Sequence, residues 1–168
     1  MNETGLEGIQ SKLPLGQSSQ QPDHYDPSLL IGVPRTLARG VEGIDASLFQ
    51  GHDLWNCWEV SWLDAHGKPV MRIGQLVVPA NSPNLVESKS LKLYLNSFAN
   101  ERIDSESQLI TRICDDLQQI LGVRPEFSLY LLDDPRFEVE APKGVCIDDL
   151  PVDLAVYEPG PLLLQTDP

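Results

Sequence analysis

The most chemically versatile side chains of this sequence lie in one short stretch, residues 87–92, which read Glu-Ser-Lys-Ser-Leu-Lys. The Glu87 carboxylate can accept two parallel N–H bonds, such as those from the N1–H and 2-amino groups of a guanine-type ring. Lys89 and Lys92 add two cations at the start of a predicted helix, whose unpaired N–H groups suit an anion such as a phosphate. The stretch therefore indicates a purine-like ligand beside a phosphorylated one. Charges at a helix start are more commonly just solvated, and that simpler interpretation stays open.

A strand and a helix must hold this stretch in place. The apolar residues Leu91, Tyr94, Leu95 and Phe98 follow helical spacing, so the sequence predicts a helix over residues 88–100, with Ser88 as its N-cap. Residues 70–79 predict a strand that ends in an apolar run and is buried on both faces. The chemistry would then sit where a strand turns into a helix.

Four more elements are predicted around this pair. Residues 55–63 alternate as a strand with odd and even positions on opposite faces, and a hairpin connection follows at 64–69. A second helix starts at Asp104 or Ser105, where Ser105 and Gln108 have capping-box spacing, and ends at Gly122. A third strand is expected at 127–132 and a fourth near 145–147.

The predicted order is strand, strand, helix, helix, strand, strand. Segregated strands and helices favour an α+β fold, with an antiparallel four-stranded sheet (ββααββ) and two helices packed on one face. The open edges of such a sheet favour an oligomer. Before this module (residues 41–150) we expect an extended N-terminal arm (1–40), whose Arg35 and Arg39 suit the surface better than a partner subunit or an anion. After it we expect a proline-rich linker (151–168).

Composition limits the classes of function. The net charge of -13 argues against a nucleic-acid partner, whose binding surface would be basic. No apolar run is long enough to span a membrane, and no signal peptide is visible. The three cysteines, Cys57, Cys114 and Cys146, form no CxxC pair, which indicates a reduced, cytoplasmic protein. The three histidines lack metal-ligand spacing, so no metal site is expected.

Several blocks of the sequence together resemble a known family. They are residues 15–18, 25–35, 52–55, 59–63, 87–94 (Glu-Ser-Lys-Ser-Leu-Lys-Leu-Tyr) and 144–149 (Gly-Val-Cys-Ile-Asp-Asp). The block at 87–94 resembles the signature motif of the NADPH-dependent 7-cyano-7-deazaguanine reductases (the QueF family), nitrile reductases of queuosine biosynthesis, a tRNA modification pathway. In particular, the chain is similar to the amino-terminal module of the two-module form.

The resemblance implies a tunnelling fold (T-fold) whose units associate through their sheets, with sites between units and a homo-oligomer, a dimer in the full-length form. It implies 7-cyano-7-deazaguanine as substrate, 7-aminomethyl-7-deazaguanine as product and NADPH as cofactor. Val86, Glu87 and Ser88 match the positions that hold the substrate, with Glu87 on its amidine edge. Ser88 and Lys89 match positions that contact NADPH, whereas Lys92 belongs to the motif without an assigned contact.

One part of the family pattern is missing. In the family, a cysteine thiolate attacks the nitrile to give a thioimide, and an aspartate supplies protons. The block that carries them, Cys-x-x-Thr/Ser-x-Gln-Pro-Asp, and a later His-Glu pair do not occur here. No catalytic residue is therefore expected in this chain, and a second T-fold module would supply the catalytic cysteine. A non-catalytic T-fold that binds a deazaguanine or pterin-like ring, and a module that only builds an oligomer, remain alternatives.

Overall fold

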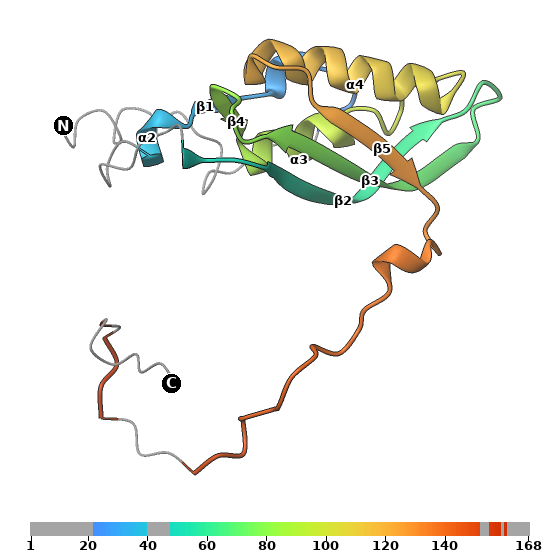
Figure 1. Ribbon diagram of the computed structural model, residues 1–168. Helices are drawn as coiled ribbons and strands as arrows, with labels where there is room; N and C mark the ends of the chain where they lie inside the picture. Colours follow the sequence, from blue (N-terminus) through green and yellow to red (C-terminus); the bar gives the residue numbers. More distant parts are fainter. Residues whose placement is uncertain (1–21, 40–47, 152–154, 159, 161–168) are drawn as a thin grey trace. The chain divides into compact units, whose positions relative to one another are not determined.

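The central element is a long antiparallel hairpin, β2 (His52–Leu63) and β3 (Pro69–Pro79). In this computed structural model, which describes residues 22–39, 48–151, 155–158 and 160, β5 (Glu126–Tyr130) pairs with the other side of β3. The sheet order is β2-β3-β5, with all pairs antiparallel (Figure 1). The hairpin turn is fixed by the Asp64 carboxylate, which accepts the N–H groups of His66 and Lys68, both at 2.9 Å.

A second, two-stranded sheet joins β1 (Gly32–Pro34) to β4 (Asn84–Val86), with Gly32 opposite Val86. The 3₁₀ helix η1 (Pro27–Leu29) precedes β1, and the short helix α2 (Thr36–Arg39) follows it. Neither strand was predicted, because three residues are too few to show a period of two. The extended segment expected before the module thus takes part in a sheet beside residues 84–86.

Two helices cover one face of the larger sheet. The helix α3 (Ser88–Asn96) is shorter than predicted, since Ser97 already forms its C-cap. The helix α4 (Glu106–Leu121) agrees with the prediction: Ser105 caps its start by accepting the N–H of Gln108, and Gly122, at φ 77°, ends it. Gly122 adopts this left-handed backbone conformation readily because it has no Cβ atom that would clash with the backbone.

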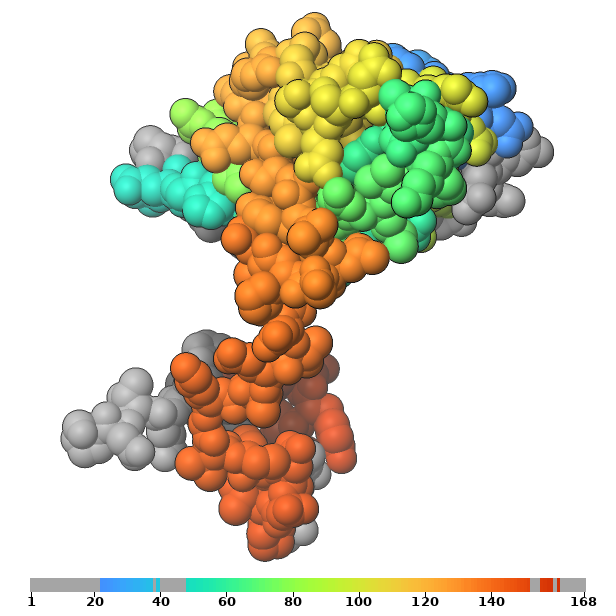
Figure 2. All heavy atoms as spheres, turned by 90° about the vertical axis from the view of Figure 1, so that its right-hand side faces the viewer, coloured from blue at the N-terminus to red at the C-terminus, as the bar shows by residue number. Residues whose placement is uncertain are grey.

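The core lies between this helical layer and the sheet. Fully buried residues of α4 recur at helical spacing: Leu109, Ile113, Leu117 and Leu121. From the sheet, Val60, Trp62, Leu76, Val78 and Phe127 face the helices. Near the hairpin turn, Arg72 on β3 reaches the first turn of α4, with its Nε 2.8 Å from Glu106 Oε1. Figure 2 shows the hairpin end (green) adjoining α4 (yellow to orange) on this side.

The predicted alternation along residues 55–63 is wrong at its midpoint. A β-bulge interrupts the register between Cys57 and Val60, so the inward face changes from odd to even residues. Trp55 and Cys57 pack against the core before the bulge, and Val60 and Trp62 are buried after it. An extra residue in one strand moves all later side chains to the other face, which the alternation alone could not reveal.

The predicted fourth strand near 145–147 is also wrong. Val145 and Ile147 are 91% and 66% exposed and belong to no strand. Two β-type residues flanked by Gly144 and a turn have no described neighbour to pair with, and propensity alone does not make a strand. The described part of the chain therefore has a three-stranded and a two-stranded antiparallel sheet with two long helices, in place of the four-stranded ββααββ order.

The chain divides into two units, Met1–Arg136, which contains both sheets, and Phe137–Pro168. The short 3₁₀ helix η3 (Pro135–Phe137) lies where they meet in sequence.

Candidate functional site

The predicted motif lies where β4 passes into α3. β4 pairs with β1 and ends at this point. The Glu87 N–H extends this pairing by one residue, because it donates to the Ile31 carbonyl at 2.8 Å. Val86 and Glu87 are both buried, whereas Ser88 is exposed and Lys89 is half-buried. The structure thus brings the predicted residues together at one helix entrance, with unequal access to a ligand.

Glu87, and not Ser88 as predicted, is the N-cap of α3. Its Oε1 accepts the Lys89 N–H at 3.0 Å and its Oε2 accepts the Ser90 N–H at 2.6 Å. These amides are the second and third of the helix, the two that a capping side chain ordinarily satisfies. The negative charge also lies at the positive end of the helix dipole. Sequence reasoning chose Ser88 because serine is the commoner cap.

This cap changes the expected anion site. Two of the N–H groups that were predicted to hold a phosphate, those of Lys89 and Ser90, are occupied by the chain's own carboxylate, so an anion here would depend mainly on side chains. The cap also leaves the carboxylate well oriented. Oε2 accepts only the Ser90 N–H among the described contacts, so its second lone pair can accept a further N–H. Oε1 also accepts the Ser88 hydroxyl at 3.5 Å, a long bond that a ligand N–H could replace. A buried, fixed carboxylate of this kind suits a flat ligand edge with two parallel donors.

The other predicted residues differ in what they can contact. The Val86 side chain is only 3% exposed and belongs to the hydrophobic core, so it could meet a ligand only through its backbone. Ser88 presents its hydroxyl at the surface, 3.5 Å from Glu87 Oε1. Lys92 lies one turn further along α3 and is exposed.

A groove of about 790 Å³ begins beside this entrance, between α3 and the middle of β2. The helix contributes Ser88, Leu91, Lys92, Leu95 and Asn96 to its lining. The strand contributes residues 55–59 and Ser61, and Pro22, Asp23, Ala99 and Asn100 complete the wall. Val86, Glu87 and Lys89 do not line it. Sequence reasoning missed the contribution of β2. The one available signal was Trp58, a large aromatic residue on a polar stretch, which is 61% exposed at the bulge.

Two of the described cysteines, Cys57 and Cys114, are not activated. Cys57 lies in the groove, but burial raises the pKa of its thiol to about 11. Burial also raises the pKa of Cys114, which packs in the core as expected. Cys146 is exposed. Since the thiolate is the nucleophile, a raised pKa makes Cys57 and Cys114 unreactive at neutral pH.

Arg35 was predicted at the surface and is instead buried, 7% exposed. Its Nε donates to Ser82 Oγ at 3.0 Å, and its Nη2 pairs with the Asp53 carboxylate. A buried guanidinium needs such partners, and the pairing ties β1 to β2 and to the loop before β4. Arg39 stacks over the Phe49 ring, with its Cζ 4.1 Å from the ring centre.

The described residues contain neither a candidate membrane-spanning helix nor a cluster of metal-binding side chains. Within the ranges that the structure covers, no helix is long and apolar enough to cross a membrane. Over those same ranges, no three side chains of the metal-binding types gather into a cluster.

Comparisons with known proteins place the chain in a family. A family model described as "Nitrile reductase, 7-cyano-7-deazaguanine-reductase N-term" matches residues 21–129. A protein of Chromohalobacter salexigens named NADPH-dependent 7-cyano-7-deazaguanine reductase is 43% identical over 154 residues, which cover 90% of this chain and 56% of the relative. Proteins with the same name from Dechloromonas aromatica and Azoarcus sp. are each 44% identical, over 92% and 98% of this chain and 56% and 60% of the relatives. The chain thus spans a little over half the length of these curated relatives, and it belongs to the 7-cyano-7-deazaguanine reductase family, whose amino-terminal region it matches.

Proposed function

We propose that this chain is the amino-terminal module of an NADPH-dependent nitrile reductase that converts 7-cyano-7-deazaguanine to 7-aminomethyl-7-deazaguanine in queuosine biosynthesis. In this proposal the module supplies substrate and cofactor contacts, and a second T-fold module supplies the nucleophilic cysteine. The observation that carries the proposal is the buried Glu87 carboxylate, held by the Lys89 and Ser90 amides in a chain that belongs to this family.

Glu87 would bind the amidine edge of the deazaguanine through both carboxylate oxygens, with a ring N–H replacing the long bond from the Ser88 hydroxyl at Oε1. Hydrogen bonds to a charged group contribute about 1.5–3 kcal/mol each. Because the helix amides already fix the carboxylate, little conformational entropy is lost when the ring binds. Ser88 would contact the ring through its hydroxyl and Val86 through its backbone, since the Val86 side chain is buried.

For the cofactor, the residues at the helix entrance fit side-chain contacts better than an amide cradle, because Glu87 occupies the Lys89 and Ser90 amides. Ser88 and Lys89 would hold NADPH by a hydroxyl and an ammonium group, and Lys92 adds an exposed cation on the same helix. When bound, NADPH would supply hydride, and the change from a nitrile to an aminomethyl group takes two hydrides in succession. The residues of this chain only bind and orient.

The nucleophile is assigned outside this chain because burial raises the pKa values of Cys57 and Cys114, and because the family's cysteine block is missing from the sequence. We likewise propose a T-fold, with an arm at 1–40, the module at 41–150 and a linker at 151–168. The outer edge of β2 supports association with another unit. At one end of that edge, Leu63 bonds to Glu101 and Ile103 at 2.9 Å each.

A ring-binding protein without a redox step is the second candidate. The same observation favours it: a built carboxylate site in a chain whose Cys57 and Cys114 thiols are not activated. The two candidates differ in affinity. A module needs its second half to bind the ring well, whereas an independent binder does not.

A chemical-shift titration of the isotope-labelled chain with 7-cyano-7-deazaguanine tests both, because it detects even millimolar binding. We expect the Lys89 and Ser90 amide signals to shift, since those amides contact the carboxylate that would receive the ring. Millimolar affinity supports the module, and micromolar affinity supports the independent binder. Identical titrations of the native chain and Glu87→Ala would refute ring recognition by Glu87.

A further inference from the structure

Ile31 and Glu87 form the next residue pair of the β1–β4 ladder, one step beyond Gly32 and Val86, but one of its two hydrogen bonds is rerouted. The Glu87 N–H donates to the Ile31 carbonyl at 2.8 Å, as in an ordinary antiparallel pair. The returning bond passes through a side chain. The Ile31 N–H donates to Ser90 Oγ at 3.1 Å, and that hydroxyl donates to the Glu87 carbonyl at 2.7 Å.

The inserted hydroxyl lets the chain pass from strand to helix while the backbone N–H and C=O groups of Ile31 and Glu87 keep their hydrogen-bond partners. The Glu87 carbonyl also accepts the Leu91 N–H at 3.0 Å, the first hydrogen bond of α3, so it has turned away from the ladder. Ser90 fills the space that this turn opens and is fully buried. Without the hydroxyl, the Ile31 N–H would lose the only acceptor that the described residues give it.

Ser90 also holds the side chain of Glu87, because its own N–H donates to Glu87 Oε2 at 2.6 Å. One residue therefore fixes the Glu87 backbone at its carbonyl and the Glu87 carboxylate at one oxygen. The Ile31 carbonyl fixes the remaining backbone group. Every torsion that would swing the carboxylate away from the helix entrance breaks one of these bonds.

We propose that Ser90 is a positioning residue, which aims the Glu87 carboxylate at its ligand by locking the strand-to-helix junction through Ile31. This inference rests on the proposed function of Glu87, and it assigns a role to a residue that would not itself touch the ring. The competing explanation is that the Ser90 hydroxyl only adds stability.

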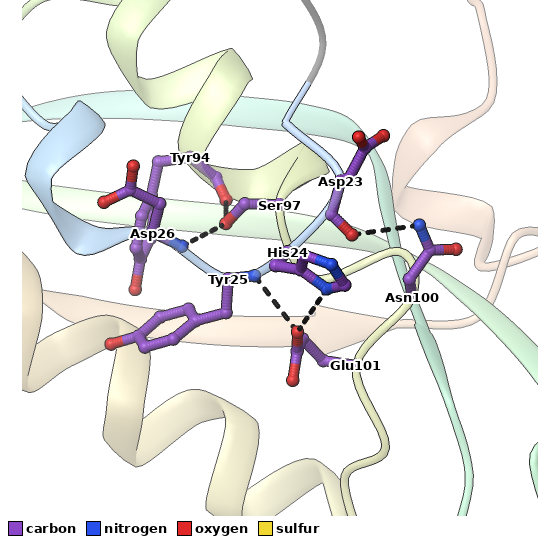
Figure 3. Close-up of polar contacts among 8 residues, drawn as sticks. All are labelled: Asp23, His24, Tyr25, Asp26, Tyr94, Ser97, Asn100 and Glu101. Carbon is purple, nitrogen blue, oxygen red and sulfur yellow. Dashed lines mark hydrogen bonds and ion pairs between the residues drawn. The ribbon is translucent and has the colours of Figure 1, made fainter.

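The chain contains a matched control for that explanation. Ser97, two helical turns further along the same face, is also buried, donates to a carbonyl three residues back (Tyr94, 2.6 Å) and accepts a backbone N–H from the N-terminal segment (Asp26, 3.3 Å). Figure 3 shows this bridge at the far end of α3, beside Tyr25 and Glu101. The Ser97 hydroxyl ties the same two parts of the chain together as Ser90 does, but without any contact to Glu87.

The experiment compares Ser90→Ala with Ser97→Ala in the full chain by two measurements. The first needs no ligand: the exchange rate of the Lys89 amide proton, which reports how firmly the Glu87 carboxylate is held. We expect about a tenfold faster exchange in Ser90→Ala, the effect of about one net hydrogen bond, and no change in Ser97→Ala. An unchanged Lys89 rate in Ser90→Ala, or an equal rise in both variants, overturns the proposal.

The second measurement is the shift titration with 7-cyano-7-deazaguanine. We expect Ser90→Ala to weaken binding about tenfold or more and Ser97→Ala to weaken it less than twofold, although both lower the melting temperature. Equal affinity losses in the two variants overturn the positioning role. Glu87→Ala is titrated in parallel and tests the proposed function separately. If this variant binds the ring as tightly as the native chain does, ring recognition by Glu87 is refuted. The exchange measurement then still decides whether Ser90 holds the carboxylate. If Ser90→Ala does not fold, Ser90→Cys serves in both measurements, since it keeps the side chain small and weakens both hydrogen bonds.

Discussion

Replacing Glu87 separates two roles of one carboxylate: the cap of α3, which the structure shows, and the acceptor for a ligand, which we propose. Glu87→Ala removes both. Losing a cap costs about 0.5–2 kcal/mol of stability, and losing the charge at the helix start costs about 0.3–1 kcal/mol more. The buried Ser90 amide also loses its acceptor. We therefore expect the free energy of unfolding to fall by about 1–3 kcal/mol, measured by urea denaturation.

Glu87→Asp removes only the second role. Aspartate is among the best N-caps, so the Lys89 and Ser90 amides keep an acceptor and stability should change by less than about 1 kcal/mol. The carboxylate, however, retracts by one C–C bond, about 1.5 Å. A displacement of that size breaks a two-point hydrogen bond, and we expect the affinity for 7-cyano-7-deazaguanine to fall about 10- to 100-fold.

The two assays together make the reasoning refutable. If Glu87→Ala unfolds at the same urea concentration as the native chain, the carboxylate does not cap α3. If Glu87→Asp binds the ring as tightly as the native chain, the position of the carboxylate does not matter and recognition lies elsewhere. Circular dichroism of both variants before titration confirms that they are folded.

Three further predictions concern the rest of the fold. Burial raises the pKa of Cys57 to about 11 from 9.0, so its thiolate at pH 8 is about a hundredfold scarcer than in an ordinary cysteine, and iodoacetamide should label it correspondingly slowly by mass spectrometry; rapid labelling of the folded chain would contradict this. Asp116 accepts the hydroxyls of Tyr25 and Tyr94 at 2.6 and 2.5 Å, so Asp116→Asn should lower the free energy of unfolding by about 2–3 kcal/mol, whereas Asp115→Asn on the exposed face of α4 should change it by less than about 1 kcal/mol; equal effects would argue against the tyrosine pair. Burial, followed by the bonds to Asp116, raises the pKa of both tyrosines above the ordinary 10.0. The folded chain then keeps protons that the unfolded chain releases, so this contribution to stability is complete below pH 10 and declines as the pH rises above it, and Tyr25→Phe should flatten that decline in urea denaturation at pH 9 to 11.

The long periodic elements were predictable from the sequence alone. The stripe from Leu109 to Leu121, with its Ser105 cap and Gly122 stop, places α4 to within two residues. The hairpin of β2 and β3 follows from its turn residues and from the alternation of β2 as far as the bulge after Cys57. In these stretches the burial pattern and the local propensities agree, and tertiary contacts only reinforce them.

The misses lie where tertiary contacts override local patterns. The bulge after Cys57 and the short strands β1 and β4 depend on partners far away in sequence, which a local period cannot show. Within the candidate site, the types of Glu87, Ser88 and Lys89 suggested ligand chemistry. The capping role of Glu87 did not follow from them, because it depends on the side chain folding back onto its own helix. The roles of Ser90 and Arg35 were missed for a related reason. Ser90 accepts the Ile31 N–H and Arg35 donates to Ser82, so each role depends on a contact between residues about 50 positions apart.

The central claim, that this chain recognises the nitrile substrate without reacting with it, is tested most directly by intact-mass spectrometry of the chain incubated with 7-cyano-7-deazaguanine, with NADPH absorbance followed in parallel. A covalent thioimide would add the mass of one substrate molecule to the protein. The account predicts ligand-dependent shifts at the Lys89 and Ser90 amides, no mass increase and no NADPH oxidation. A mass increase on Cys57, Cys114 or Cys146, or steady NADPH oxidation by the purified chain, would show that the chain contains its own nucleophile and would contradict the claim.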